Sequence, residues 1–136
     1  MSGKTFLDTN IVVYLYSGDE PEKRAAALAL IEQNNSIVST QVLSELANTL
    51  GRKFRLPFDV VAQAVAEVRD ACTVVPVIPD TIAQALALAQ KYKYSYYDSL
   101  ILAAALSAGC ETLASEDMQH GQAIEGVMTI RNPFGK

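Results

Sequence analysis

The sequence contains few of the residues on which many enzymes depend. Its 136 residues include one histidine, two cysteines and no tryptophan. A zinc site needs several Cys or His ligands, and both a Ser-His-Asp triad and a cysteine nucleophile would depend on His120 alone. The phosphate-binding patterns G-x-x-x-x-G-K-[ST] and G-x-G-x-x-G are also absent. The carboxylate is the common catalytic group that remains in quantity, with 15 Asp and Glu residues.

Long apolar runs are lacking too. The longest runs, 25–31 and 100–106, have seven residues each, whereas about 20 are needed to cross a bilayer. Asp8 interrupts the apolar stretch near the start, so no signal peptide is expected. Cys72 and Cys110 form no close pair and no disulfide framework, which favours a cytoplasmic location.

The composition and the order of apolar runs predict the fold class. Half of the residues are hydrophobic and 19% are charged, as in a folded protein. The length, without any Gly/Ser-rich or Pro-rich linker, predicts one domain over residues 1–136. Brief strand-like runs alternate with helical stretches, and they occur at 5–7, 36–38, 73–75, 112–114 and 128–130. This alternation predicts an α/β protein, a three-layer α/β/α domain with a short, mostly parallel central sheet.

Start and stop residues mark the predicted helices. A short helix is expected after the first strand, and four longer ones at about 22–33, 40–53, 57–70 and 81–91. A further helix is expected between Ser95 and Gly109. Ser39 or Thr40 is expected to cap the second long helix, and Asp80 the fourth.

Two acidic residues in the first half of the chain stand in unusual positions. Asp8 directly follows strand 5–7, where the carboxyl end of a strand in an open α/β sheet meets ligands. Capping of the next short helix by Asp8 or Asn10 explains this acid equally well. Glu45 flanks the apolar face of helix 40–53, where an ordinary boundary residue is the commoner interpretation.

Two further acidic positions lie in the second half. Asp98 shares a helix face with apolar residues, which is costly for an ionised carboxylate unless a partner compensates it. Ser95 and Asp98 also have the spacing of a capping box, which explains Asp98 equally well. Glu116 and Asp117 follow strand 112–114, and taken alone they fit a surface turn better than a functional site.

Together these positions predict a metal site. Two acid-bearing loops follow strands and two acids lie near helix starts, and such ends can converge on one edge of a sheet. Three or four converging carboxylates repel one another and need protons or a hard divalent cation to coexist. Mg²⁺ takes such oxygen ligands and leaves positions for water and a phosphate. One metal can activate water and a second can stabilise the leaving oxygen, which suits phosphodiester cleavage.

Four segments resemble the PIN-domain ribonucleases, and within them the small VapC-type toxins of type II toxin–antitoxin systems. The segments are FLDTN at 6–10, TQVLSEL at 40–46, YDSLI at 97–101 and LASED at 113–117. The resemblance runs over about residues 6–133, and four segments in this order and spacing are fairly specific. It implies an α/β/α PIN fold and an endoribonuclease that depends on Mg²⁺ or Mn²⁺ and leaves 5′-phosphate and 3′-hydroxyl ends.

The resemblance also implies roles for individual residues. Catalysis and metal binding fall to four acids: Asp8, Glu45, Asp98 and Asp117. Supporting roles fall to Thr9, Asn10 and Ser115. The family's last motif is more often Thr-x-Asp followed soon by Phe, whereas this chain has Ser115-Glu116-Asp117 and then Met118. Spacing favours Asp117 as the fourth ligand, and Glu116 is either that ligand or a supporting residue.

The implied partners are an RNA substrate, a small antitoxin whose extended tail covers the acidic groove, and a second copy of the chain in a homodimer. Transfer RNA is the usual implied target and ribosomal RNA the alternative. The net charge of −4 argues against RNA at first. With four acids in a metal site, however, the other 11 acids match the 11 basic residues. The basic residues expected to meet phosphates are Arg52, Lys53, Arg55, Lys91 and Lys93.

Two other functions stay open from the sequence. An Asp after an apolar strand is also typical of aspartyl-nucleophile phosphatases, but the residue two beyond Asp8 is Asn10 rather than the expected acid. A catalytically silent PIN-like interaction module is the second alternative. The presence of all four acids weighs against it.

Overall fold

The computed structural model describes residues 3–33 and 35–135. Its first half contains β1 (Thr5–Leu7), α1 (Thr9–Val13), the short 3₁₀ helix η1 (Tyr14–Tyr16), α2 (Pro21–Glu32), β2 (Ser36–Ser39), α3 (Thr40–Arg52) and α4 (Phe58–Ala71). Its second half contains β3 (Thr73–Val75), α5 (Pro79–Tyr92), α6 (Tyr96–Ser107), β4 (Thr112–Ala114), β5 (Ala123–Ile124) and β6 (Met128–Arg131). The order agrees with the predicted alternation of strands and helices.

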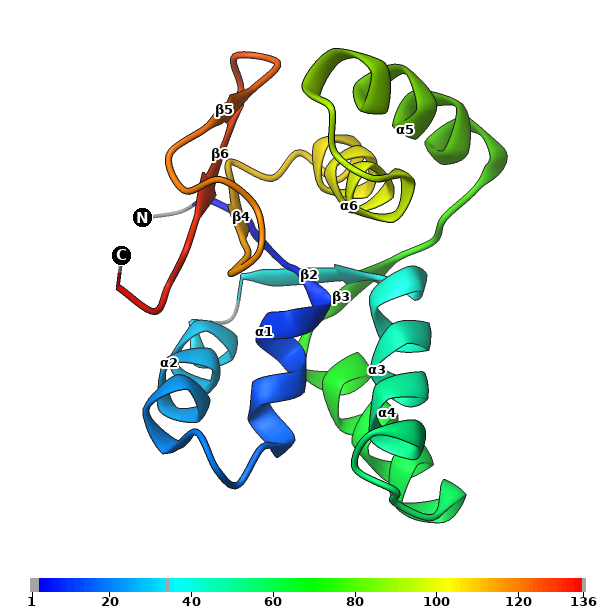
Figure 1. The fold of residues 1–136 in the computed structure, drawn as a ribbon, viewed down its shortest axis with the longest axis vertical. Coiled ribbons are helices and arrows are strands. Elements are labelled where there is room, and N and C mark those ends of the chain that lie inside the picture. The colour runs from blue at the N-terminus through cyan, green and yellow to red at the C-terminus, as the bar shows by residue number, and fades with distance from the viewer. Residues whose placement is uncertain (1–2, 34, 136) are drawn as a thin grey trace.

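The strands form one sheet in the order β3-β2-β1-β4-β6-β5. Neighbouring strands are parallel except β5, which runs antiparallel to β6. In Figure 1, α5 and α6 lie on one side of this sheet and α1 to α4 on the other. The predicted three-layer α/β/α fold with a mostly parallel sheet is therefore confirmed.

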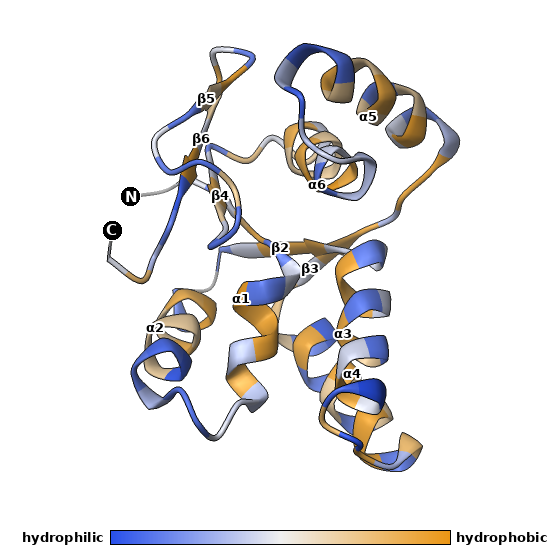
Figure 2. Ribbon diagram, in the orientation of Figure 1, coloured by the Kyte–Doolittle hydropathy of each residue, from blue (hydrophilic) through white to orange (hydrophobic). Residues whose placement is uncertain are grey.

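The buried position of α6 in the core explains the unbroken apolar run at residues 100–106. Helix α6 is buried from Ser99 to Ala105 because it lies between the sheet and α5. In Figure 2, hydrophobic residues colour much of α6 and part of β2. Within the described residues, no helix is long and apolar enough to span a membrane.

The helix starts confirm some of the predicted caps and correct one. The Ser39 hydroxyl accepts from the Val42 backbone N–H (3.3 Å), and the Ser95 hydroxyl accepts from that of Asp98 (3.2 Å). The prediction that Asp80 caps α5 was wrong, because the helix begins at Pro79 and Asp80 lies inside its first turn. Proline has no N–H to satisfy, so it suits the first helical position.

One strand was not predicted. Ala123 and Ile124 form β5, which pairs with Thr129 and Met128 after a tight turn. Two residues carry no periodic pattern, so the strand exists because β6 offers it a pairing edge.

Candidate active site

Strand register brings two distant segments together at the carboxyl edge of the sheet. Leu7, the last residue of β1, lies opposite Ala114, the last residue of β4. The next residues, Asp8 and Ser115, therefore emerge side by side. The Asp8 backbone N–H donates to the Ala114 carbonyl (3.0 Å), and the Ser115 hydroxyl donates to Asp8 Oδ2 (2.8 Å).

Asp8 is the most enclosed acid of this edge. Its side chain is only 5% exposed, and it caps α1 by accepting from the Thr9 backbone N–H (2.7 Å). Asp8 therefore both caps α1 and lies at the carboxyl edge of the sheet, so the two interpretations of this acid are compatible. The pKa of Asp8 is raised from 3.8 to about 6, mainly by burial and also by the nearby negative charges of Asp98 and Glu45, while the hydrogen bonds from Ser115 and Thr9 act against this rise.

Glu45 points from α3 towards the start of α1. Its Oε1 accepts from the Thr9 hydroxyl (2.5 Å) and its Oε2 accepts from the Gln41 side-chain amide (3.1 Å). The same Gln41 amide donates to the backbone carbonyl of Tyr97 (3.1 Å), beside Asp98 at the start of α6. Glu45 is therefore held in a defined direction, which an ordinary boundary residue does not need.

Asp98 enters the site from the opposite layer. It is half-buried in the first turn of α6, with its backbone N–H held by Ser95. Burial raises the pKa of Asp98, as do the negative charges of Asp117 and Glu45. Asp98 therefore lies in a helix start capped by Ser95 and is also close to other acids.

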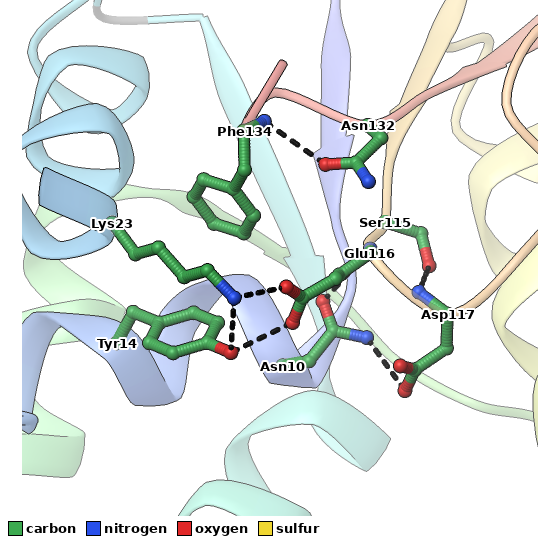
Figure 3. A network of polar contacts seen from close by, with 8 residues as sticks. All are labelled: Asn10, Tyr14, Lys23, Ser115, Glu116, Asp117, Asn132 and Phe134. Atoms are coloured by element: carbon green, nitrogen blue, oxygen red, sulfur yellow. Dashed lines mark hydrogen bonds and ion pairs between the residues drawn. The ribbon is translucent and has the colours of Figure 1, made fainter. Parts of the chain in front are cut away.

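Glu116 and Asp117 point in opposite directions. Asp117 Oδ2 accepts from the Asn10 side-chain amide (3.0 Å), and that amide also lies 3.4 Å from Asp8 Oδ2. Glu116 turns away and accepts from the Tyr14 hydroxyl (2.7 Å) and from the Lys23 ammonium group, as Figure 3 shows. Asp117 thus joins the other three acids, whereas Glu116 belongs to a separate polar network.

The four acids are close enough for the charge of one to shift the pKa of another, but their carboxylates do not converge on a single position. Asp8 is affected by Glu45 and Asp98, and Asp98 by Glu45 and Asp117. Among the described residues, no three Asp, Glu, His or Cys side chains form a ready ligand cluster. Within the part of the chain that the structure describes, no basic side chain contributes to the pKa shift of either Asp8 or Asp98. Uncompensated carboxylate oxygens that repel one another are a donor set that fits a hard divalent cation.

A groove of about 410 Å³ lies beside the site, with Thr9 and Asn10 in its lining. The lining also includes apolar Val13 and Phe54, the acids Asp19 and Glu20, and Lys53 at the end of α3. Two of the other basic residues predicted to contact RNA, Arg52 and Arg55, are exposed near Lys53.

The remaining two predicted RNA contacts lie in the other helical layer. Lys91 pairs with Glu125 (2.7 Å), and Lys93 follows α5 in a left-handed conformation with φ of +67°. The five predicted basic residues therefore form two separate groups, and the group at the end of α3 is the one that borders the groove.

Sequence reasoning missed three residues of this region. Gln41 precedes Glu45 by one helical turn, and that spacing is a signal that could have identified it. Tyr14 and Lys23 carry no local signal, because their partner Glu116 is 102 and 93 residues away. Only the tertiary fold brings them together.

Comparisons with known proteins agree with this architecture. The family model of the PIN domain matches residues 5–123. The structure of VapC20 from Mycobacterium tuberculosis, described as a sarcin-ricin loop cleaving toxin, is 24% identical, with 84% of this chain and 90% of that chain covered and a TM-score of 0.69.

Two further solved structures cover almost the whole chain. A toxin–antitoxin complex from Klebsiella pneumoniae is 22% identical, with 96% of this chain and 98% of that chain covered and a TM-score of 0.71. VapBC2 from Rickettsia felis, bound to a DNA fragment from its promoter, is 19% identical, with 94% and 97% covered and a TM-score of 0.70. Curated protein sequences give no significant match. At these identities the likeness to solved structures establishes the fold.

Proposed function

Because the chain belongs to the PIN domain family, we propose that it is a metal-dependent endoribonuclease and, more narrowly, the VapC-type toxin of a toxin–antitoxin pair. One observation carries the proposal: carboxylates from four separate segments approach one another at the carboxyl edge of the sheet, and no basic side chain of the described residues acts on Asp8 or Asp98. Burying negative charge in this way costs stability, so the arrangement calls for a function.

The residues that would hold the metal are Asp8, Glu45, Asp98 and Asp117. Carboxylate oxygens without sulfur or imidazole suit Mg²⁺, with Mn²⁺ as a substitute. When bound, such an ion lowers the pKa of water and offsets the charge that develops on a reacting phosphate.

The chain's own residues orient these oxygens. Thr9 and Gln41 hold the two oxygens of Glu45, one from each side. Ser115 donates to Asp8, and Asn10 lies between Asp8 and Asp117 with its amide directed at both. Donors that fix ligand oxygens in advance raise metal affinity and reduce the reorganisation needed during the reaction.

RNA is the proposed substrate. The groove is lined by Thr9 and Asn10, which follow Asp8, and by Lys53, whose cation can contact a backbone phosphate of an RNA strand that reaches the acids. VapC20 of Mycobacterium tuberculosis, described as cleaving the sarcin-ricin loop, supports an RNA substrate for this related fold. Transfer RNA and ribosomal RNA are both retained as substrate classes.

The proposed partners are a small antitoxin and a second copy of this chain. The complexes from Klebsiella pneumoniae and Rickettsia felis support an antitoxin partner, and the resemblance to VapC toxins motivates the homodimer. An RNA substrate also supports the cytoplasm as the location. Co-purification with the product of a neighbouring gene would support the toxin assignment, and a monomeric mass in solution would contradict the homodimer.

The two alternative functions receive less support. Asn10 donates its amide to Asp117 and faces Asp8, so the position where a phosphatase would have its second acid holds a hydrogen-bond donor. Trapping a covalent phosphate on Asp8 would reverse that judgement. A silent interaction module would not need donors aimed at Asp8, Glu45 and Asp117. Antitoxin binding without any RNA cleavage would favour it.

The test is incubation of the purified protein with total RNA, with Mg²⁺ or with a chelator, followed by mapping of the cut ends. We expect discrete cuts with 5′-phosphate and 3′-hydroxyl ends that require the metal and are lost in Asp8→Asn and Asp117→Asn. Asp80→Asn, an exposed residue of α5, is the matched control and should cleave like the wild type. Intact RNA with both Mg²⁺ and Mn²⁺ would refute the proposal.

A further inference from the structure

Glu116 lies in the site loop but points out of the site. It sits between Ser115 and Asp117, yet its carboxylate is taken up by residues of η1 and α2 (Figure 3). Oε1 accepts from the Tyr14 hydroxyl (2.7 Å), Oε2 accepts from the Lys23 ammonium group, and Lys23 also donates to the Tyr14 hydroxyl (3.3 Å). The three side chains form a closed triangle.

Two aromatic rings, those of Tyr14 and Phe134, lie against the Lys23 ammonium group of this triangle. The rings of Tyr14 and Phe134 meet edge to face with centroids 5.2 Å apart. The Lys23 ammonium nitrogen lies 5.0 Å from the Tyr14 centroid and 5.4 Å from that of Phe134. The side chains of Lys23 and Glu116 are 31% and 24% exposed. Partial removal from water and two aromatic faces make this ion pair stiffer than an ordinary surface pair.

The loop that carries Glu116 is tied to the acids on its other side. The Glu116 backbone N–H donates to Asn10 Oδ1 (3.2 Å), while the Asn10 amide donates to Asp117 (3.0 Å). The Ser115 hydroxyl accepts from the Asp117 backbone N–H (3.3 Å) and donates to Asp8. Glu116 and Asp117 are adjacent and share the partner Asn10, so holding Glu116 restricts the backbone from which Asp117 points.

We propose that Glu116, held by Lys23 and Tyr14, is a positioning residue that keeps Asp117 directed at the other three acids. The inference rests on the proposed function, because it takes Asp117 as a metal ligand. It gives the two neighbouring acids different roles, because Glu116 anchors the loop and Asp117 is the metal ligand. It also makes α2 and the segment around Phe134 part of the support of the site.

The chain contains a second triangle of the same composition. Lys91 donates to Glu125 (2.7 Å), the Tyr92 hydroxyl donates to the same carboxylate (2.8 Å), and Lys91 lies 5.3 Å from the Tyr92 ring centroid. It lies at the end of α5 near β5, and among the described residues no hydrogen bond or ion pair joins it to the four acids. Glu125→Gln is therefore a matched control for Glu116→Gln.

The experiment measures Mn²⁺ binding calorimetrically without RNA, the Mn²⁺ concentration for half-maximal cleavage, and urea unfolding. Glu116→Gln and Lys23→Met should each weaken Mn²⁺ binding and raise the half-maximal concentration by about tenfold, a typical effect of losing a residue that orients a ligand. Cleavage at saturating Mn²⁺ should stay within about twofold of wild type. Lys23→Arg should restore most of the affinity because it keeps a cation opposite Glu116. Glu125→Gln should bind Mn²⁺ like the wild type.

The outcomes separate this inference from the proposed function. If wild-type protein neither binds Mn²⁺ nor cleaves RNA, both fail together. If the wild type binds and cleaves but Glu116→Gln matches it, only the positioning role fails. It fails also if Lys23→Arg loses as much affinity as Lys23→Met. If Glu116→Gln is inactive at every Mn²⁺ concentration, like Asp117→Asn, then Glu116 is itself a ligand and the positioning role is refuted.

Discussion

Replacing Asp8 by Asn should stabilise the metal-free protein above about pH 6, although it should abolish metal-dependent cleavage. Asp8 is 5% exposed and its pKa rises from 3.8 to about 6 in the folded chain. Between these two values the folded state holds a proton that the unfolded chain has released. The stability of the metal-free wild type should therefore fall as the pH rises from about 4 to about 6, and stay lowered above that range.

The size of the effect follows from the pKa. A rise from 3.8 to about 6 corresponds to roughly 3 kcal/mol, at 1.36 kcal/mol per pKa unit. Asparagine keeps an oxygen to accept from the Thr9 N–H. Its amide cannot replace the acceptor of the Ser115 hydroxyl, whose oxygen already accepts from the backbone N–H groups of Asp117 and Met118 (3.3 Å each), and the Asn10 amide loses a weak acceptor at 3.4 Å. These two losses together offset about 1–2 kcal/mol of the gain. A net gain of about 1–2 kcal/mol at pH 7.5 is therefore expected.

Urea unfolding in a chelator, at several values between pH 4.5 and 7.5, measures this difference. The wild type and Asp8→Asn should converge at the acidic end, where Asp8 is protonated, and diverge towards neutral pH. Asp80→Asn serves as the control, because it makes the same chemical change on the exposed surface of α5. Added Mg²⁺ should stabilise the wild type and leave Asp8→Asn unchanged.

The reasoning would be refuted if Asp8→Asn were less stable than the wild type at pH 7.5 in chelator. It would also be refuted if the two proteins differed by the same amount at every pH. Either result would mean that Asp8 contributes through its hydrogen bonds rather than through the cost of its buried charge.

Three other results are expected. Thr9→Val removes the hydroxyl that donates to Glu45, so Mn²⁺ affinity measured by calorimetry should fall about tenfold. Thr9→Ser keeps the hydroxyl and should keep the affinity. Equal affinities for the two variants would contradict the role of this contact. Lys53→Gln should raise the KM for RNA, leave kcat unchanged and reduce the dependence of binding on salt concentration by about one unit of slope. Lys4→Gln, which lies before the opposite end of β1, should change none of these quantities. Equal KM values for the two variants would show that Lys53 does not contact the RNA. Mn²⁺ affinity should fall as the pH drops through about 6, because binding needs ionised Asp8, and constant affinity between pH 5 and 7.5 would contradict this.

The sequence predicted the architecture well because local signals and the global fold agree. Apolar runs and capping residues marked most helices within one or two residues, and Ser39 and Ser95 cap where expected. The errors fall where local signals are weak or compete. Asp80 is a good capping residue, but Pro79 already occupies the first helical position. The strand β5 owes its existence to its neighbour β6 rather than to its own two residues.

The sequence by itself determined which chemistry was open to this protein. With one histidine, two cysteines and 15 acids, it left carboxylates as the candidate ligands and placed four of them at strand ends and helix starts. Those acids remain predicted ligands, and each could be explained alone as a cap, a boundary residue or a turn.

Only the tertiary structure decided how these acids relate to one another. The pairing of Leu7 with Ala114 sets Asp8 beside Ser115, and Lys23 and Tyr14 turn Glu116 away while Asp117 faces the site. Such contacts join residues about 90 to 107 positions apart, and a short-range pattern carries no information about them. The composition limits the chemistry, whereas strand register and long-range hydrogen bonds determine the geometry.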